Sequence, residues 1–472
     1  MSINDIDVDQ ALKEAREILK EEKNLSPAFK AIVEVLILVV SLLTNRLGRN
    51  SRNSSKPPSQ DPNRERKSKS KGEKRKPGGQ AGHPGTTLQK IDTPDQIEEI
   101  AVDRSTIPSG DYVQTGYESR QVFDVKIGLC VTEYRAEILQ DTVGVRYVAR
   151  FPEGVTKAVQ YGAEVKAQSV YMSQFQLVPQ ARVQDYFNDQ VGLSISKASI
   201  GNFNREACDG LDAFEVWAKR ALIASFLNHA DETGINIDGK KAWIHNLSNE
   251  QVTLYHVDPK RGQEAMDRMG VLPYYHGRLC HDHWTPYYRY GKVIHVLCNA
   301  HHLRELERVI EEEGHVWAKG MKTFLLALND EVHASGGVLS NEKIIACQKR
   351  YVEILDQGEL ECPKPPPKEP GKRGRQKKNF SRNLLERLRD FQEDTLRFMA
   401  EAIVPFTNNQ GERDLRMTKV QQKISGCFRS MEGARIFCRI RSFLSTCRKN
   451  NVSPTDALRL LFQGKLPEFI SK

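Results

Sequence analysis

The order of strand-like and helix-like patterns between residues 222 and 313 constrains the fold of this chain more than any other feature. The apolar run 222–231, the segment INIDGKKAWIH and the segment QVTLYHVD predict three antiparallel strands, with Asp238-Gly239 as the hairpin turn between the first two. RGQEAMDRMG then predicts a short helix, GRLCHD and KVIHVLC a fourth and a fifth strand, and AHHLRELERVIEEE a helix. This order indicates an α/β fold with one mixed sheet.

The predicted strands end in acidic residues. Three antiparallel strands followed by alternating helix and strand are typical of a ribonuclease H-like core, in which the ends of the first and fourth strands lie side by side. Asp231 in NHADETG and Asp282 in GRLCHD are therefore expected to meet. The segment TNNQGERDLRMTKVQQK predicts a later helix with Glu412 in its first turns. The plainer alternative for Asp231 is a solvated turn, since Asp-Glu-Thr-Gly is good turn material.

Three such carboxylates suit the chemistry of phosphodiesters. Two Mg²⁺ ions about 3.5–4 Å apart stabilise charge on the attacking and leaving oxygens when carboxylates hold them. We expect Asp231, Asp282 and Glu412 to be catalytic and to bind Mg²⁺, for which Mn²⁺ can substitute. Glu232 points to the other side of its strand and is expected to be structural. Asp414 lies roughly on another face of the helix and is a weaker candidate.

Cysteine and histidine gather near the same acids, in CHDHW and CNAHH. One zinc cluster is not expected, because His281 and His283 flank Asp282 whereas His301 begins a helix. His301 is expected to approach the active site or DNA, with a structural junction as the alternative. We expect His283 and Trp284 to contact a DNA end, with a packed loop as the more ordinary explanation. Further candidate DNA contacts on the later helix are Arg413, Arg416 and Lys419.

The N-terminal region carries a helix with an apolar seam. Ser26-Pro27 is a helix start signal, and apolar residues then recur at heptad spacing. This favours self-association, with packing on the rest of the chain as the alternative. The run AIVEVLILVVSLL is shorter than the roughly 20 residues of a membrane span and contains Glu34, so no span is expected. The seam residues are Phe29, Val33, Leu36, Val40, Leu43 and Leu47.

The charge is concentrated in one segment. The chain of 472 residues has a net charge of +9, and Arg46 to Lys90 alone contains thirteen Lys or Arg against three Asp or Glu. Rich in Ser, Pro and Gly, this segment predicts a flexible polycation that contacts nucleic acid, with a solvated linker as the alternative. Nine cysteines without a C-x-x-C pair, and no cleavable leader pattern, favour a reduced cytoplasmic protein at the nucleoid.

Two further regions bear on DNA. VPQARVQDYFNDQVGLSISKASIGNFNREA predicts a helix opened by Pro179, a turn at Gly192-Leu193 and a second helix capped by Ser194 or Ser196, which is typical of a helix-turn-helix. The loop CPKPPPKEPGKRGRQKKNFSRN is a second basic candidate, with a disordered connector as the alternative. The residues of the second helix that we expect to face a major groove are Lys197, Ser199, Asn202 and Arg205.

Several long motifs resemble the bacterial transposases of the insertion-sequence 66 family over nearly the whole chain. They are NSSKPPSQDPN, KRKPGGQAGHPG, HADETG, TLYHVDPKRGQEAMDRMGVLP, HDHWTPYYRY, CNAHHLRELE, NNQGERDLRMTKVQQKISGCFRSMEGARIFCRIRSFLSTCRKN and NVSPTDALRLL. The resemblance implies a catalytic triad at Asp231, Asp282 and Glu412, a DDE mechanism, a leucine-zipper-like helix and accessory proteins of the same element. It departs at residues 91–150, where the family's zinc-binding cysteines are reduced to Cys130, so no zinc site is assigned.

The expected fold is an α/β ribonuclease H-like core with a helical insertion, preceded by a coiled-coil helix, a small β-rich module and a helical DNA-binding region. The expected function is an enzyme that binds transposon ends and target DNA as a homo-oligomer, then cleaves and transfers strands. The alternatives are a catalytically decayed repressor of its element and a nuclease on branched DNA. The expected segments are 1–49 helical and zipper-like, 50–90 basic disordered linker, 91–157 β-rich and degenerate zinc-finger-like, 158–220 helix-turn-helix-like, 221–425 catalytic with an insertion at about 315–400, and 426–472 helical.

Overall fold

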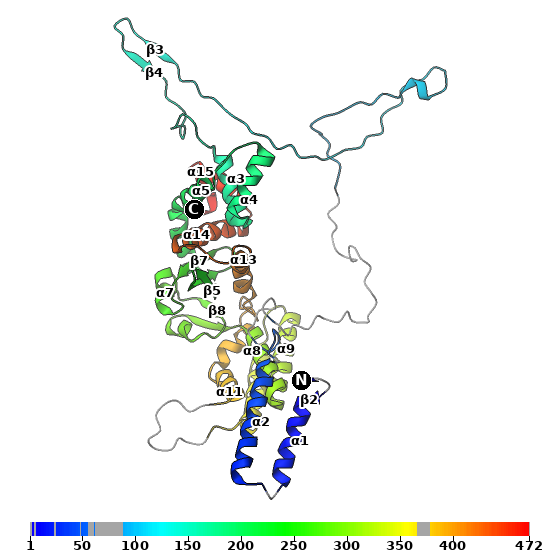
Figure 1. Ribbon diagram of the computed structural model, residues 1–472, viewed down its shortest axis with the longest axis vertical. Coiled ribbons are helices and arrows are strands. Elements are labelled where there is room, and N and C mark those ends of the chain that lie inside the picture. The colour runs from blue at the N-terminus through cyan, green and yellow to red at the C-terminus, as the bar shows by residue number, and fades with distance from the viewer. Residues whose placement is uncertain are drawn as a thin grey trace.

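The chain folds around one mixed sheet with helices on its faces (Figure 1). The computed structural model describes residues 2–3, 6–22, 25–47, 49–54, 61, 88–365 and 378–471. Most of the predicted basic linker and the centre of the predicted basic loop, 366–377, lie outside these residues.

The sheet has five strands in the order β7-β6-β5-β8-β9. β5, β6 and β7 are antiparallel neighbours, whereas β5, β8 and β9 run parallel. All five strands expected between residues 222 and 313 are present in the expected sequence order. Their bounds are β5 (Leu227–Ile237), β6 (Lys240–Ser248), β7 (Thr253–Asp258), β8 (Arg278–His281) and β9 (Ile294–Leu297).

The first strand begins later than expected. Residues 222–224 close helix α6 (Asp212–Ala224), and β5 continues past the acids to Ile237. The reason is that Phe214, Ala218 and Leu222 are buried at helical spacing. The first residues of the apolar run therefore form the end of a helix, and the strand begins after them. Asp231 therefore lies within the strand and not at its end.

The hairpin between β5 and β6 is turned by Asp238 and Gly239, as predicted. Both residues have positive φ, 48° and 76°, which is the conformation that a two-residue turn between twisted strands requires. Phe428 pairs with this end of β5, because its N–H donates to the carbonyl of Asn236 at 2.9 Å and its carbonyl accepts from Asp238 N–H at 2.9 Å. These bonds tie the chain that follows helix α13 (Asn409–Ser425) to the sheet.

Helices cover the sheet and build a second core beside it. α13 packs against β5 and β6, and α14 packs against β7. The insertion is helical where the structure describes it, and its apolar core around Trp317 and Tyr351 continues into β8 and β9 through Cys280 and Val296. The helices after β7 are α7 (Gln263–Met269), α8 (Asn299–Glu313), α9 (Val316–Ala334), α10 (Asn341–Glu361), α11 (Phe380–Asp390), α12 (Gln392–Leu396), α14 (Met431–Lys449), α15 (Pro454–Phe462) and α16 (Glu468–Ser471).

A helical layer precedes the sheet, made of α3 (Ala163–Val170), α4 (Gln180–Tyr186), α5 (Lys197–Asp209) and α6. The predicted turn between two helices is present: Gly192 ends the first at φ 73°, a conformation that glycine adopts without strain. Of the two predicted caps, Ser196 accepts the N–H of Ser199 at 3.0 Å. α3 and α5 share a core with α14 and α15.

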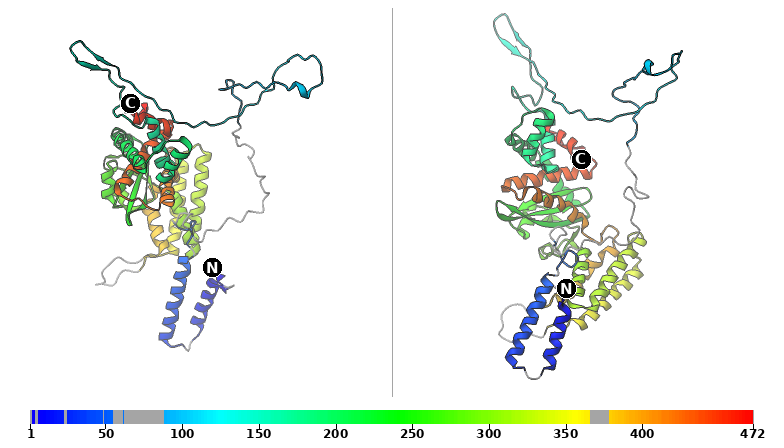
Figure 2. Two further views of the ribbon diagram at one scale, coloured as in Figure 1. Left: turned by 45° about the horizontal axis from the view of Figure 1, so that its top comes forward. Right: turned by 45° about the vertical axis from the view of Figure 1, so that its right-hand side comes forward.

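Residues 91–157 differ from the expected β-rich module. The structure places one two-stranded ribbon there, β3 (Ile138–Gln140) and β4 (Arg146–Val148), and every residue of both strands is exposed. Apolar side chains in the alternating stretch before it are also exposed, including Val122 and Val131. Alternation makes a stable strand only where another layer covers the apolar face, and this segment extends away from the body of the protein (Figure 2).

The N-terminal helices form an antiparallel hairpin, α1 (Val8–Glu21) and α2 (Pro27–Leu47), preceded by the two-residue strands β1 (Ser2–Ile3) and β2 (Ile6–Asp7). Ser26 caps α2 as predicted, accepting the N–H of Phe29 at 3.2 Å. Among the described residues, the stretch Pro27–Thr44 is the one helix long and apolar enough to cross a membrane. One such helix near the N-terminus is weak evidence for a membrane protein.

Candidate functional site

Three carboxylates from separate elements face a common region at the edge of β5 and β8. Asp231 lies in β5, Asp282 follows the last residue of β8, and Glu412 lies in the first turn of α13. β5 and β8 are parallel, and His229 is opposite Cys280. The same register carried on by two residues places Asp231 level with Asp282.

The charges of these groups act on one another. Burial raises the pKa of Asp231 well above 3.8, and the neighbouring carboxylates of Glu232, Asp282 and Glu412 raise it further. Asp231 Oδ1 accepts a hydrogen bond from the N–H of Glu232 at 2.9 Å, and this bond lowers the pKa of Asp231. The site thus gathers negative charge around Asp231, while the side chain of Glu412 stays 40% exposed.

Each of the other two acids has a neighbour that orients it. Asp282 Oδ1 accepts the backbone N–H of Trp284 at 3.0 Å. Glu412 lies 3.9 Å from Arg304, which projects from α8. Lys419, two turns along α13, donates to the carbonyl of Gly234 at 3.3 Å. Burial lowers the pKa of Lys419, and the charge of Asp231 opposes that change.

Glu232 is held by an ion pair and by a hydrogen bond from a tyrosine, and burial and then the charge of Asp282 raise its pKa. Its carboxylate accepts two hydrogen bonds from Arg261 and one from Tyr287 Oη at 2.7 Å. The Arg261 guanidinium in turn lies over the rings of Trp243 and Trp284, 4.8 and 4.4 Å from their centroids. Sequence reasoning missed Arg261, since only the fold brings it to Glu232.

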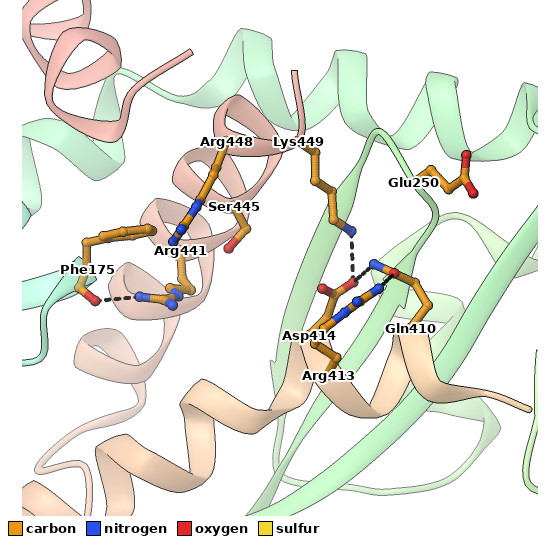
Figure 3. Close-up of a pocket in the computed structure, with 9 residues that line it drawn as sticks. All are labelled: Phe175, Glu250, Gln410, Arg413, Asp414, Arg441, Ser445, Arg448 and Lys449. Carbon is orange, nitrogen blue, oxygen red and sulfur yellow. Dashed lines mark hydrogen bonds and ion pairs between the residues drawn. The ribbon is translucent and has the colours of Figure 1, made fainter. Parts of the chain in front are cut away.

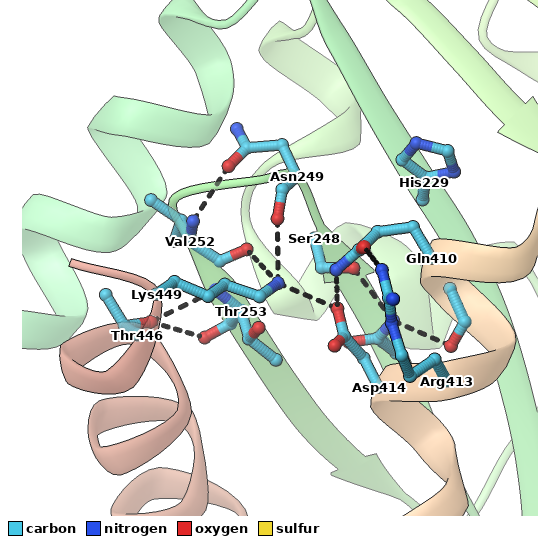
Figure 4. Close-up of polar contacts among 12 residues, drawn as sticks. His229, Ser248, Asn249, Val252, Thr253, Gln410, Arg413, Asp414, Thr446 and Lys449 are labelled. Carbon is cyan, nitrogen blue, oxygen red and sulfur yellow. Dashed lines mark hydrogen bonds and ion pairs between the residues drawn. The ribbon is translucent and has the colours of Figure 1, made fainter. Parts of the chain in front are cut away.

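Asp414 is also held away from the three acids. It forms an ion pair of 2.8 Å with Lys449 of α14 and accepts Gln410 Nε2 at 2.9 Å (Figure 4). Lys449 additionally donates to the carbonyls of Asn249 and Val252. Asp414 thus links α13, α14 and the turn after β6, which agrees with the preference for Glu412 over Asp414.

His301 lies beside Glu412. Among the described residues, Cys298, His301 and Glu412 are the one group of three whose possible metal-binding atoms all lie within 4.8 Å of one another. Burial, then the charge of Arg304, lowers the pKa of His301 to about 4, and its Nδ1 is buried without a hydrogen-bond partner. His301 is therefore neutral at physiological pH, with a nitrogen available to a ligand.

His283 and Trp284 pack against other side chains. His283 adopts φ 68° and contacts the Phe391 ring at 4.4 Å. Burial lowers the pKa of His283 to about 4. Trp284 lies against Arg261 and is partly exposed. Both positions match the packed-loop alternative, and their contact with DNA stays a prediction.

The predicted groove-facing residues of α5 are mostly at the surface. Lys197 and Asn202 are exposed, and Ser199 is partly buried by the helix cap. Arg205 is exposed but pairs with Glu432 of α14 at 3.1 Å and bonds Asn202. On α13, Arg413 and Arg416 are exposed and Lys419 is half-buried near Asp231.

A mixed sheet with carboxylates converging from two strands and a helix defines an α/β protein with an acidic centre. The model of the Transposase IS66 family matches residues 158–436, more than half of the chain, and the chain therefore belongs to that family. Residues 4–89 match a family of unknown function, DUF6444. No curated protein matches the chain. Membership in a transposase family identifies a DNA-processing enzyme with DNA as its partner.

Proposed function

We propose that this protein binds the ends of a bacterial insertion sequence and catalyses metal-dependent DNA strand cleavage and strand transfer through Asp231, Asp282 and Glu412. The observation that carries the proposal is the parallel register of β5 and β8, which sets Asp231 level with Asp282, together with Glu412 in the first turn of the helix that packs on β5. Like charges held together in a buried site are costly unless a cation or a reaction uses them.

The strand order supports a ribonuclease H-like core. Three antiparallel strands, β5 to β7, continue on the other side of β5 into the parallel strands β8 and β9. The acids lie at the junction between the antiparallel and parallel halves. α13 packs against β5 and β6 and contributes the third acid.

The donors present fit divalent cations. Carboxylate oxygens are the ligands that Mg²⁺ and Mn²⁺ prefer. The three acids do not form a group within 4.8 Å, unlike Cys298, His301 and Glu412. A wider spacing suits two ions about 3.5–4 Å apart. Such ions, when bound, would stabilise the charge on the attacking and leaving oxygens of a phosphodiester.

The chain's own residues complete the site. Arg304 orients Glu412 from 3.9 Å, and the Trp284 N–H fixes one oxygen of Asp282 at 3.0 Å. Lys419 and the neutral His301 lie beside these acids on α13 and α8, where they can contact the phosphates that flank the scissile bond. Accessory proteins, a homo-oligomer and a cytoplasmic, nucleoid-associated location belong to the same proposal.

The test is strand cleavage and joining by the full-length protein on duplexes that carry the inverted repeats flanking its gene, with Mg²⁺ or Mn²⁺ and the accessory proteins. Asp231→Asn, Asp282→Asn and Glu412→Gln are each expected to reduce cleavage at least ~10³-fold, since each removes a ligand from the reacting centre. DNA affinity should stay within about twofold.

Asp238→Asn is the matched control. It removes one carboxylate from the same hairpin, and Asn adopts the positive φ of 48° at that position. Cleavage by this variant should equal that of the wild type. Full activity of any triad variant, or an inactive wild type under these conditions, would contradict the proposed chemistry.

A further inference from the structure

A basic pocket lies on the side of α13 that faces away from Glu412. It has a volume of about 520 Å³ and opens between the first turns of α13 and the last turns of α14 (Figure 3). Glu412 and Asp414 are two residues apart and so point to nearly opposite sides of the helix. The residues that line the pocket are Phe175, Glu250, Gln410, Arg413, Asp414, Arg441, Ser445, Arg448 and Lys449.

The lining has more positive than negative charge. Lys449 and Asp414 neutralise each other in their 2.8 Å ion pair. Within the described part of the chain, Arg413, Arg441 and Arg448 form no ion pair, and one further acid, Glu250, lines the pocket. Three guanidinium groups against one carboxylate leave an excess of positive charge that suits an anion.

Arg441 is buried, which distinguishes this pocket from a cluster of exposed cations on the surface. It is only 6% exposed, and its Nε is buried without a hydrogen-bond partner in the described residues. Its contacts are the carbonyl of Phe175, at 2.6 Å from Nη1, and the Phe175 ring at 4.4 Å. A buried guanidinium without a carboxylate is costly, and an anion in the pocket would offset that cost.

The pocket is placed to act together with the acidic centre. Gln410, Arg413 and Glu412 belong to the same turn of α13, so the two sites are separated by about the 10 Å width of one helix. Phosphates recur along a DNA strand at about 3.4 Å intervals of helix axis. One strand that passes around the first turn of α13 can therefore present a scissile phosphate to Glu412 and another phosphate, at least about three nucleotides away, to the pocket.

We propose that this pocket binds a backbone phosphate of the DNA substrate, with Arg441 at its floor and Arg413 and Arg448 at its rim. This inference rests on the proposed function, because it takes DNA as the partner. It adds Arg441 and Arg448, which the sequence patterns did not single out, to the groups that hold the substrate. The contact positions the strand and reads no base sequence.

The experiment measures binding of the full-length protein to a labelled inverted-repeat duplex and to a random-sequence duplex between 50 and 200 mM salt. Arg413→Gln with Arg448→Gln should weaken binding to both duplexes about 10-fold and reduce the slope of log affinity against log salt by about 1. The matched control is Arg220→Gln with Lys319→Gln, two exposed cations on α6 and α9, which should change neither quantity.

Arg441→Met tests the floor of the pocket independently. It should weaken DNA binding several-fold while leaving the thermal midpoint unchanged or raised, because it removes an unpaired buried charge. A purely structural Arg441 would instead lower the midpoint and leave DNA affinity intact. That result would overturn its assignment.

The two proposals fail in different ways. If the wild type cleaves DNA and all pocket variants bind like the control pair, only the phosphate pocket is wrong. If binding depends on the pocket but no divalent cation yields cleavage, the pocket stands and the catalytic proposal falls. Millimolar inorganic phosphate that stabilises the wild type but not Arg441→Met, with DNA affinity equal in both, would assign the pocket to a free anion instead. A wild type that binds no duplex would overturn both proposals.

Discussion

At the scale of single residues, Asp231 lies in a site that disfavours its own charge. An acid whose pKa is higher in the folded than in the unfolded chain holds its proton more tightly when folded. Its contribution to stability is therefore fully present below the unfolded value near 3.8 and is lost as pH rises through the raised folded value. At neutral pH the ionised group opposes folding, unless a cation offsets the charge.

Asp231→Asn is accordingly expected to stabilise the protein at pH 7.5 in the presence of a chelator. The expected gain is about 0.5–2 kcal/mol, the usual range for one stabilising substitution. The physical reason is that the amide is neutral and still accepts the N–H of Glu232, the bond that the carboxylate makes at 2.9 Å. Denaturant unfolding with and without EDTA measures this, and a destabilised variant in EDTA would contradict it.

Mg²⁺ is expected to make the wild type more stable than Asp231→Asn, the reverse of their order in the chelator. Saturation to about 100 times the dissociation constant stabilises a single-site protein by about 2.7 kcal/mol. The wild type should gain about this much from Mg²⁺, whereas Asp231→Asn and Asp282→Asn should gain little, because each has lost a ligand. Thermal unfolding across a Mg²⁺ titration gives the comparison. Equal gains in wild type and variants would place the cation elsewhere.

At the scale of elements, α2 exposes the apolar seam that its heptad spacing predicted. Leu36 and Leu43 are 56% and 53% exposed, whereas Ile37 packs inward at 7%. Exposed apolar surface of this extent is typical of an interaction site. The helix is present, while its self-association stays a prediction.

Leu36→Lys with Leu43→Lys is expected to convert an oligomer of the full chain into a species of lower mass, because two charges would be buried in the seam. Sedimentation or light scattering measures the mass. Leu38→Lys with Leu42→Lys, which alters another exposed face of α2, is the matched control and should leave the mass unchanged. Equal dissociation by both pairs would indicate a non-specific apolar contact.

At the scale of the whole molecule, buried histidines govern the acid limit of stability. Burial lowers the pKa of both His245 and His295 from 6.5 to about 4. A histidine with a depressed folded pKa contributes stability that is present above its unfolded pKa and is lost as pH falls toward the folded value. Each of the two therefore costs stability between pH 6.5 and 4, when the unfolded chain takes up protons and the folded chain does not.

The chain should thus lose about 2 kcal/mol for each such histidine between pH 6.5 and 5, at about 1.4 kcal/mol per pH unit. Denaturant midpoints at pH 7, 6 and 5 measure it, and His295→Gln should flatten the profile. A midpoint that is constant between pH 7 and 5 would show that these rings are not buried neutral.

The amino-acid sequence by itself determined the local elements: the five strands in order, the turn at Asp238-Gly239, the cap at Ser26 and the helix that carries Glu412. These depend on periodicity and on backbone preferences of neighbouring residues, which are properties of short segments. The sequence also selected three acids whose charges act on one another in the structure, and their catalytic role stays a prediction.

Only the tertiary structure decided which polar groups are satisfied. Arg261 meets Glu232, Lys449 meets Asp414, and Arg441 is buried without a carboxylate partner among the residues that the structure describes. It also decided that the alternating pattern before β3 has no layer to cover it. Such outcomes depend on contacts between residues 29 to 266 positions apart, and the local sequence pattern does not indicate which distant side chain will make the contact. Packing therefore settled the environment of each charge, whereas local chemistry settled the order of the helices and strands.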